Sequence, residues 1–291
     1  MTMQFNFLAT LDNLITALIY LLVSFVLFLI GKKVYQLIHR DIDMDHELVE
    51  KDNLAFSLAN VGYYTGLIIA ISSVYAGEGI AHIIDNIIDI FIYGMLSIIL
   101  LNASMFISDK IILRKFSVKK EIIEDQNAGT GVIEGAICIA NGLIIFGVLA
   151  ENQDNFIGVL VLWAISQIAL VLVGIIYNLI TPYDIHEHIE KDNVAVGIGF
   201  AGAIVAIGNL VRFGAQMDAD NWIMVGENLI LETGVGLLML PLARLLTDKI
   251  LLPKRKLTDE IINQENPNIG AAIIEAFSYI GGSMLICMSF S

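Results

Sequence analysis

Carboxylates inside long apolar stretches are the residues of this sequence best suited to chemistry. Glu134 and Glu275 each follow the start of such a stretch, and Glu232 interrupts another. A charge near the bilayer centre costs at least about 2.5 kcal/mol, so these side chains should turn inward. If Glu134 and Glu275 face each other, they can share a proton or bind a cation. Their shallow depth slightly favours a simpler role, a hydrogen bond between helices or contact with headgroups.

The other reactive side chains do not indicate an enzyme. His186-Glu187-His188 is the nearest approach to a metal motif, but its i,i+2 spacing separates the two rings and favours a solvated loop. No nucleophile motif accompanies it. Cys138 and Cys287 lie in apolar runs, where thiols behave as small hydrophobic groups. We therefore expect no catalytic residue, cofactor or bound metal.

Composition places these residues in a membrane protein. Of the 291 residues, 57% are hydrophobic and 16% are charged, and the mean hydropathy is +0.77. This leaves too little polar surface to cover a soluble globule. The net charge of -14 also argues against nucleic-acid binding.

Eight apolar stretches approach the length of about 20 residues that crosses the hydrocarbon core. Acidic residues lie within or beside the third and the seventh stretch, so a protein with only six spans is the alternative. We expect an all-α, polytopic membrane protein of about eight transmembrane helices. The stretches cover residues 13–31, 54–76, 87–107, 130–150, 156–180, 194–214, 224–246 and 270–290.

Charge in the connections predicts the orientation. Lysine and arginine accumulate after spans one, three, five and seven, in connections that include Lys51, Lys115, Lys191 and Arg255. Basic loops stay in the cytoplasm, so both termini should lie on the periplasmic or extracellular side. Only Arg212 lies near the opposite face. The connections there are acidic, with Glu78, Asp85, Glu151, Asp154, Asp218 and Asp220.

Four segments share one plan, in which a glutamate is followed six residues later by an asparagine and then by a span rich in small residues. Asparagine is a strong N-cap residue, so each should begin a span. The preceding stretch should form a short interfacial helix. Capping alone explains these residue types and is favoured over ligand binding. The pairs are Glu47 and Asn53, Glu121 and Asn127, Glu187 and Asn193, and Glu260 and Asn266.

The segments form a duplication within a duplication. Residues 50–53 recur unchanged at 190–193, and Asp109-Lys110-Ile111 recurs as Asp248-Lys249-Ile250. Each half, 1–150 and 151–291, has four spans, and an even number returns the chain to its starting side. The halves should therefore be parallel four-helix repeats with a finer twofold repeat inside each. We expect them to pair about an axis along the membrane normal, as in a closed dimer.

These Glu-x-Ile-x-x-x-Asn-x-Ala segments resemble those of the bacterial YjfL-like inner-membrane proteins, a family of domain of unknown function 350. The resemblance covers the whole chain, and each half resembles one complete four-span member. It implies a bacterial inner-membrane location and supplies no substrate, cofactor or catalytic residue. The sequence departs from the pattern at Val49, at Gly129 and at Pro267-Asn268-Ile269.

Two functions remain open. The first is a membrane scaffold that organises lipids or a cytoplasmic protein partner; it is slightly favoured because capping and glycine-rich packing explain most polar residues. Its recruiting surface would be the basic group Arg114, Lys115, Lys119 and Lys120. The alternative is a proton- or cation-coupled channel or transporter that uses the intramembrane carboxylates Glu134, Glu275 and Glu232. Either function is compatible with an oligomer.

Overall fold

The computed structural model describes residues 7–75, 83–150, 152, 155–216, 222–252 and 254–290. All regular secondary structure in these ranges is helical, as the sequence predicts. Eight of the described helices are long and apolar enough to cross a membrane. These helices are α1 (Phe7–Ile38), α2 (Leu54–Ser72), α3 (Ile83–Ile111), α4 (Ala128–Ala150), α5 (Phe156–Ile180), α7 (Val194–Ala215), α8 (Trp222–Leu246) and α10 (Ile269–Phe290).

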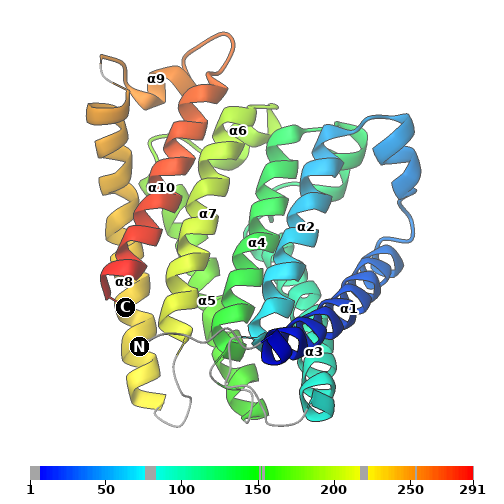
Figure 1. The fold of residues 1–291 in the computed structure, drawn as a ribbon. Helices are drawn as coiled ribbons and strands as arrows, with labels where there is room; N and C mark the ends of the chain where they lie inside the picture. Colours follow the sequence, from blue (N-terminus) through cyan, green and yellow to red (C-terminus); the bar gives the residue numbers. More distant parts are fainter. Residues whose placement is uncertain are drawn as a thin grey trace.

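Short helical segments connect the long helices. The π-helical turns are η1 (His46–Glu50), η3 (Lys120–Glu124) and η4 (Thr247–Leu251). The short α-helices are α6 (Ile185–Glu190) and α9 (Leu257–Ile261), which lie at the same end of the bundle (Figure 1). A 3-10 turn, η2 (Ser73–Tyr75), extends α2 at its other end. A short helical segment thus precedes each of α2, α4, α7 and α10, as the interfacial-helix interpretation requires.

The helices α2, α4, α7 and α10 stand side by side in a row (Figure 1). Glycines set the spacing within this row. A Cβ at Gly62 of α2 would lie 2.0 Å from Cα of Gly135 in α4, and one at Gly197 of α7 would lie 2.6 Å from Cα of Gly129. The backbones therefore touch, as small residues allow in membrane helix pairs. The two middle helices, α4 and α7, are buried along most of their length.

The row is open, which corrects the closed pairing expected from the sequence. The halves meet through α4 and α7. A twofold axis would require an equivalent contact between α10 and α2, but these helices lie at opposite ends of the row (Figure 1). The four repeats are arranged head to tail, so each presents one face to the repeat before it and another to the repeat after it.

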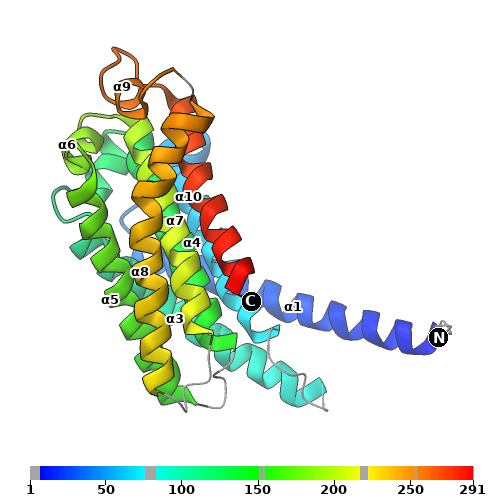
Figure 2. The same cartoon turned by 90° about the vertical axis from the view of Figure 1, so that its left-hand side faces the viewer.

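The remaining spans pack around this row. The helices α5 and α8 contact each other and α7, and α8 also contacts α10. The helices α1 and α3 pack together beside α2. The N-terminal part of α1 projects away from the bundle (Figure 2). Most of α1 is consequently exposed apolar surface, which only lipid or another protein can cover.

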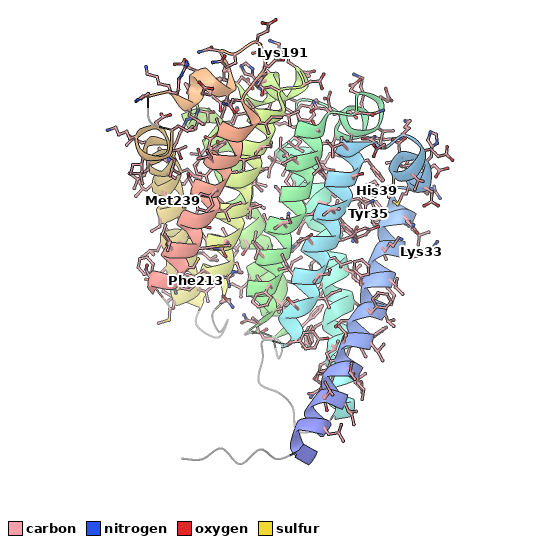
Figure 3. The ribbon with its side chains drawn as sticks, turned by 45° about the horizontal axis from the view of Figure 1, so that its top comes forward. Lys33, Tyr35, His39, Lys191, Phe213 and Met239 are labelled. Carbon is pink, nitrogen blue, oxygen red and sulfur yellow. The ribbon has the colours of Figure 1, made fainter. Side chains whose placement is uncertain are left out.

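The two ends of the bundle differ in charge. Connections that contain Lys51, Lys115, Lys191 and Arg255 lie at the end that carries α6 and α9 (Figure 1). We call the end that carries α6 and α9 the basic end. Figure 3 shows Lys191 at the basic end and Phe213 at the other. The acidic residues predicted for the opposite end lie outside the described residues, or have side chains that do: Glu78, Asp85, Glu151, Asp154, Asp218 and Asp220.

Candidate functional site

The asparagines of the repeated segments begin spans and also bind the next repeat. Oδ1 of Asn53 accepts a hydrogen bond from the backbone N–H of Phe56 at 3.0 Å, which caps α2. Its Nδ2 donates to the carbonyl oxygen of Ile122 in η3 at 2.9 Å. One side chain therefore satisfies a helix end and joins two repeats. Asn127 repeats both bonds: it accepts from the backbone N–H of Thr130 at 3.2 Å and donates to the carbonyl oxygen of Ile189 at 2.6 Å. Asn193 likewise accepts from the backbone N–H of Val196 at 3.1 Å and donates to the carbonyl oxygen of Ile261 at 2.9 Å.

The glutamates of the first two segments accept from these asparagines. Nδ2 of Asn53 donates to Oε2 of Glu47 at 2.8 Å, and the bond to Glu121 is 2.9 Å. Burial raises the pKa of Glu47, but hydrogen bonds from Lys51 and Asn53 outweigh it, so the net shift is downward. The pKa of Glu121 is raised, mainly by burial and also by the nearby charge of Asp125. The difference follows from the residue four positions after the glutamate, Lys51 or Asp125.

The third segment departs from the predicted pairing of Glu187 with Asn193. Glu187 is exposed and pairs with Lys191 at 2.6 Å. The backbone N–H of Asn193 donates to the carbonyl oxygen of His188, five residues earlier, whereas the backbone N–H of Asn53 donates to the carbonyl oxygen of Glu47, six residues earlier. The turn is one residue shorter here, so His188 occupies the position of the glutamate. The side chain of Glu187 therefore points away from the cap.

The fourth segment corrects the prediction that Asn266 caps the last span. The backbone N–H of Ala271 donates to Oδ1 of Asn268 at 3.0 Å, and Nδ2 of Asn268 donates to Glu260 at 2.9 Å. In the first three segments, the residue before the cap has a φ of 53° to 60°. Pro267 cannot adopt such an angle, because its ring holds φ near about -65°. The turn therefore uses two more residues before the cap.

Glu134 and Glu275 occupy the same position of the repeat but do not meet. Each lies seven residues after its cap, at 127 and 268, which is about 10 Å along the helix. They lie on α4 and α10, which α7 separates (Figure 1). The arrangement considered from the sequence, in which they face each other, is wrong, because all repeats in a head-to-tail row have the same orientation.

Glu275 is neutralised inside the second half. Nη1 of Arg244 donates to its carboxylate at 2.6 Å, and the hydroxyl of Tyr279 donates at 2.8 Å. Arg244 also donates to Oγ1 of Thr258 at 3.2 Å and lies 5.5 Å from the ring centre of Tyr183. Glu275 is only 1% exposed, so this is a closed and satisfied buried ion pair.

Glu134 has a carboxyl group as its partner. The carboxyl group of Asp109 on α3 lies beside it, and both groups line the same cavity. Oε2 of Glu134 and Oδ1 of Asp109 are buried without any partner in the described structure. Ionised carboxylates only accept hydrogen bonds, so these two groups can bond to each other only when one of them carries a proton. Glu134 and Asp109 form what we call the carboxyl pair.

A cavity of about 80 Å³ adjoins the carboxyl pair. Its polar lining consists of Tyr35, His39, Lys119 and the pair itself. Tyr35 lies in the last turn of α1, and His39 follows directly after the helix (Figure 3). Since a water molecule occupies about 30 Å³ in the liquid, the cavity has room for a few waters or a small hydrated cation.

The third predicted carboxylate, Glu232, lies elsewhere. It precedes Arg244 by twelve residues on α8, which is about 18 Å along the helix. Its side chain is buried beside Gly214, and its Oε2 has no partner among the described residues. The structure therefore does not join the three predicted carboxylates into one site.

Comparisons with known proteins agree with the repeat. Residues 9–149 and 152–290 each match the family Domain of Unknown Function (DUF350). The chain belongs to this family. It is also 22% identical over 254 residues to a UPF0719 transmembrane protein of Aquifex aeolicus (strain VF5), an alignment that covers 86% of this chain and 90% of that protein. No solved structure matches. The protein is thus an integral, multi-pass membrane protein with two tandem DUF350 copies.

The two DUF350 copies differ at the position that decides the charge of the site. Arg244 precedes Asp248 by four residues, and Met105 precedes Asp109 by the same number. The first copy therefore keeps a carboxyl pair where the second has an ion pair with Arg244. Sequence reasoning missed Asp109 and Arg244, although the shared Asp-Lys-Ile triplet aligns them. This alignment is the signal that would have exposed the difference.

A further buried polar residue lies in the first DUF350 copy at the same repeat position. Asn60 lies seven residues after Asn53, at the repeat position of Glu134. It is buried, and neither atom of its amide group has a partner in the described structure. Counting from the cap would have identified this position as polar in three of the four repeats; the third has Phe200.

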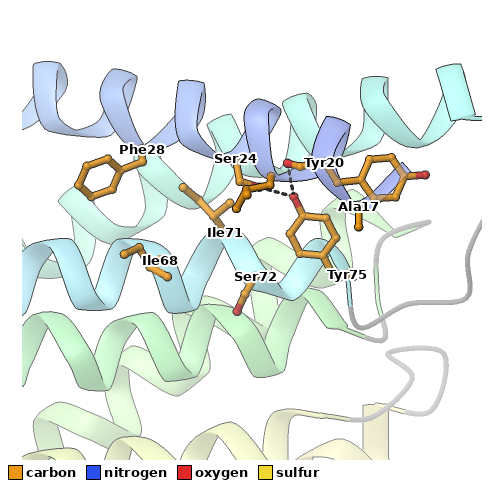
Figure 4. Close-up of a pocket in the computed structure, with 9 residues that line it drawn as sticks. Ala17, Tyr20, Ser24, Phe28, Ile68, Ile71, Ser72 and Tyr75 are labelled. Atoms are coloured by element: carbon orange, nitrogen blue, oxygen red, sulfur yellow. Dashed lines mark hydrogen bonds between the residues drawn. The ribbon is translucent and has the colours of Figure 1, made fainter. Parts of the chain in front are cut away.

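A larger cavity between α1 and α2 is apolar. It has a volume of about 410 Å³, and Figure 4 shows its lining from Ala17 to Tyr75. The hydroxyl of Tyr75 donates to the carbonyl oxygen of Tyr20 at 3.1 Å and contacts Ser24. These bonds tie α1 to the end of α2. None of the described residues that line this cavity is charged, so the carboxyl pair remains the strongest candidate for chemistry.

Proposed function

We propose that the protein is a proton- or cation-coupled membrane transport element whose binding site is the carboxyl pair Asp109–Glu134. The observation that supports this is two adjacent carboxyl groups that line one small polar cavity, each with a buried oxygen that has no partner in the described structure. Such a pair binds a proton or a small cation because two adjacent negative charges repel each other. Arg244 supplies a fixed cation in the second copy, so one exchangeable ion per chain is expected.

The scaffold alternative has less support. Three of the four basic residues that would recruit lipids or a protein partner pair with acidic residues of the chain itself, which weakens their attraction for other anions. The hydrogen bond from Lys119 lowers the pKa of Asp41, and that from Lys115 lowers the pKa of Asp184. The pairs are Lys115–Asp184 (2.5 Å), Lys119–Asp41 and Lys120–Asp125 (3.0 Å).

The proposed location is the bacterial inner membrane, with the basic end in the cytoplasm and both termini outside. Lys119 lines the cavity of the carboxyl pair and belongs to the connection that precedes η3 at the basic end. The site would therefore exchange its proton or cation with the cytoplasm. Passage to the other side would require a change in the packing of α1, α3 and α4, which surround the pair.

Ion flux into vesicles that contain the purified protein tests this proposal. The variants E134Q and D109N should abolish proton or cation flux without unfolding the protein, because each removes one ionisable member of the pair. E232Q is the matched control, since it removes another buried carboxyl group that has no part in the site. Infrared difference spectra should also lose a protonated carboxyl band in E134Q. Absence of flux in the wild type, or unchanged flux in E134Q, would favour the scaffold.

A further inference from the structure

A second polar cavity lies at the end of the row opposite the basic end. It has a volume of about 360 Å³ and is bordered by the C-terminal ends of α2, α4, α7 and α10. Its polar lining comes from Ser72, Asn209, Arg212 and Cys287. The apolar walls come from Ile69 of α2, Leu143 and Phe146 of α4, and Met284 and Met288 of α10.

The guanidinium group of Arg212 is held in a fixed position there. Its Nε donates to Oδ1 of Asn209 at 3.1 Å, and its Nη1 donates to Oε1 of Gln216 at 2.6 Å. Asn209 is itself anchored, because its Nδ2 donates to Oγ of Ser283 on α10 at 3.2 Å. A guanidinium has five N–H donors, so these two bonds and a contact with the Cys287 thiol leave donors for a ligand. In the described part of the chain, no carboxylate forms an ion pair with Arg212.

The position of Arg212 matches the depth of lipid headgroups. It lies three residues before the end of α7, about 5 Å from the helix terminus. Arginine at the end of a membrane span places its charge at the interface. A phosphate at that depth would belong to a lipid whose acyl chains run along the apolar walls.

The surroundings favour a lipid over a free anion. The C-terminal ends of four helices meet here, and each carries a partial negative charge that opposes the binding of an anion. The single charge of Arg212 offsets this only in part. An amphiphile gains additional free energy when its acyl chains cover the apolar walls, which inorganic phosphate cannot do.

We propose that this cavity binds an anionic phospholipid, with Arg212 donating to the phosphate and the walls from α2, α4 and α10 contacting an acyl chain. This site is separate from the carboxyl pair, which lies between α3 and α4, near the opposite end of α4. Binding would also join the four repeats of the row at the end opposite the capping asparagines.

Lipid binding to the purified full chain tests the proposal. Native mass spectrometry with phosphatidylglycerol and phosphatidylcholine should show at least about a fivefold preference for the anionic lipid, as one basic residue near a headgroup provides. R212Q should remove this preference, and R212K should retain part of it. S72F should weaken the binding of both lipids, because it fills the cavity without changing its charge.

Control variants separate this site from the other basic and acidic groups. R114Q removes an exposed charge at the basic end, and E134Q removes a member of the carboxyl pair; both should leave the lipid preference unchanged. An undiminished preference in R212Q would overturn the proposal. Equal protection against thermal unfolding by inorganic phosphate and by phosphatidylglycerol would also overturn it, since that result would indicate a site for soluble anions.

Discussion

Arg244 donates a 2.6 Å hydrogen bond to the buried carboxylate of Glu275. In the first DUF350 copy, Met105 occupies the position of Arg244 and Glu134 that of Glu275. The same helical framework therefore carries its own cation in one copy and lacks it in the other. Under the proposed function, this asymmetry means that duplication gives one exchangeable site, because the ion pair of the second copy is already satisfied.

Removal of Arg244 alone should be strongly destabilising. R244M leaves Glu275 buried without its counter-charge, and breaking such a pair costs about 3–5 kcal/mol. E275Q leaves Arg244 unpaired in the same way. The double variant R244M/E275Q should recover much of the loss, because neither charge then remains. Thermal unfolding in one detergent can measure all three variants, and losses that simply add would contradict a direct pair.

The spans and the first three caps could be predicted from the sequence because they depend on local properties. Hydropathy determines which segments enter a membrane. Asn53, Asn127 and Asn193 lie within three residues of the N–H groups that they cap, so residue type and position suffice. Asn266 failed because Pro267 changes the allowed turn, and a spacing rule derived from the other segments ignores that restriction.

The partners of the intramembrane carboxylates could not be predicted in this way. Parity of the spans shows that the halves are parallel, but both a closed pair and an open row satisfy parity. The choice depends on contacts such as Gly62 with Gly135, which the glycine content alone does not assign. Once the row is open, Glu134 must find its partner within its own copy, and that partner is Asp109.

The bonds between repeats can be tested at Asn127. N127D retains the capping oxygen, because aspartate caps as well as asparagine, but it removes the donor to Ile189 and places a carboxylate beside Glu121. We expect N127D to be less stable than N127A by at least about 1 kcal/mol, because the new carboxylate would face the carboxylate of Glu121 and the carbonyl oxygen of Ile189, which are all hydrogen-bond acceptors. The free energies can be compared by denaturant titration in mixed micelles.

Asn155 provides the control for that measurement. It caps α5 by accepting from the backbone N–H of Gly158 at 2.8 Å, and it is only partly buried. N155D should therefore be nearly neutral. A neutral N127D would show that the bonds between repeats contribute nothing to stability.

The pH dependence of stability should change in K51Q. The pKa of Glu47 is lower in the folded protein than its usual value. Its ionised form therefore stabilises the folded state at pH values above the usual pKa, and this stabilisation is lost as the pH falls through the folded-state pKa. Without Lys51, burial should raise the pKa of Glu47, as it raises that of Glu121. Ionisation of Glu47 then destabilises the folded K51Q protein as the pH rises. The difference in free energy of unfolding between the wild type and K51Q should therefore increase from about pH 4 to about pH 7.

K191Q is the matched control for K51Q, because Lys191 pairs with Glu187 at the same i,i+4 spacing. Both side chains of that pair are exposed, so its loss should cost less than about 1 kcal/mol at any pH. Stability curves of K51Q and K191Q with the same shape would contradict the role assigned to burial at Glu47.

The proposed topology predicts which positions an external reagent can reach. Cys138 and Cys287 are both buried, so the natural chain should give little background labelling. A cysteine in place of Val49, which is 78% exposed, should react with an impermeant thiol reagent only after the cells are opened. Labelling of this position in intact cells would reverse the orientation.

Backbone contact within the row is tested by adding one methyl group. A Cβ at Gly62 would lie 2.0 Å from Cα of Gly135, and no flexible side chain there can move aside. G62A must therefore separate α2 from α4 and should cost at least about 2 kcal/mol, as overpacking does in tight cores. A Cβ at Gly234 in α8 has nothing within 4 Å, so G234A should be neutral or stabilising, because alanine favours helix. Thermal unfolding of the two variants in the same detergent makes the comparison, and equal stability would mean that the helices of the row do not touch.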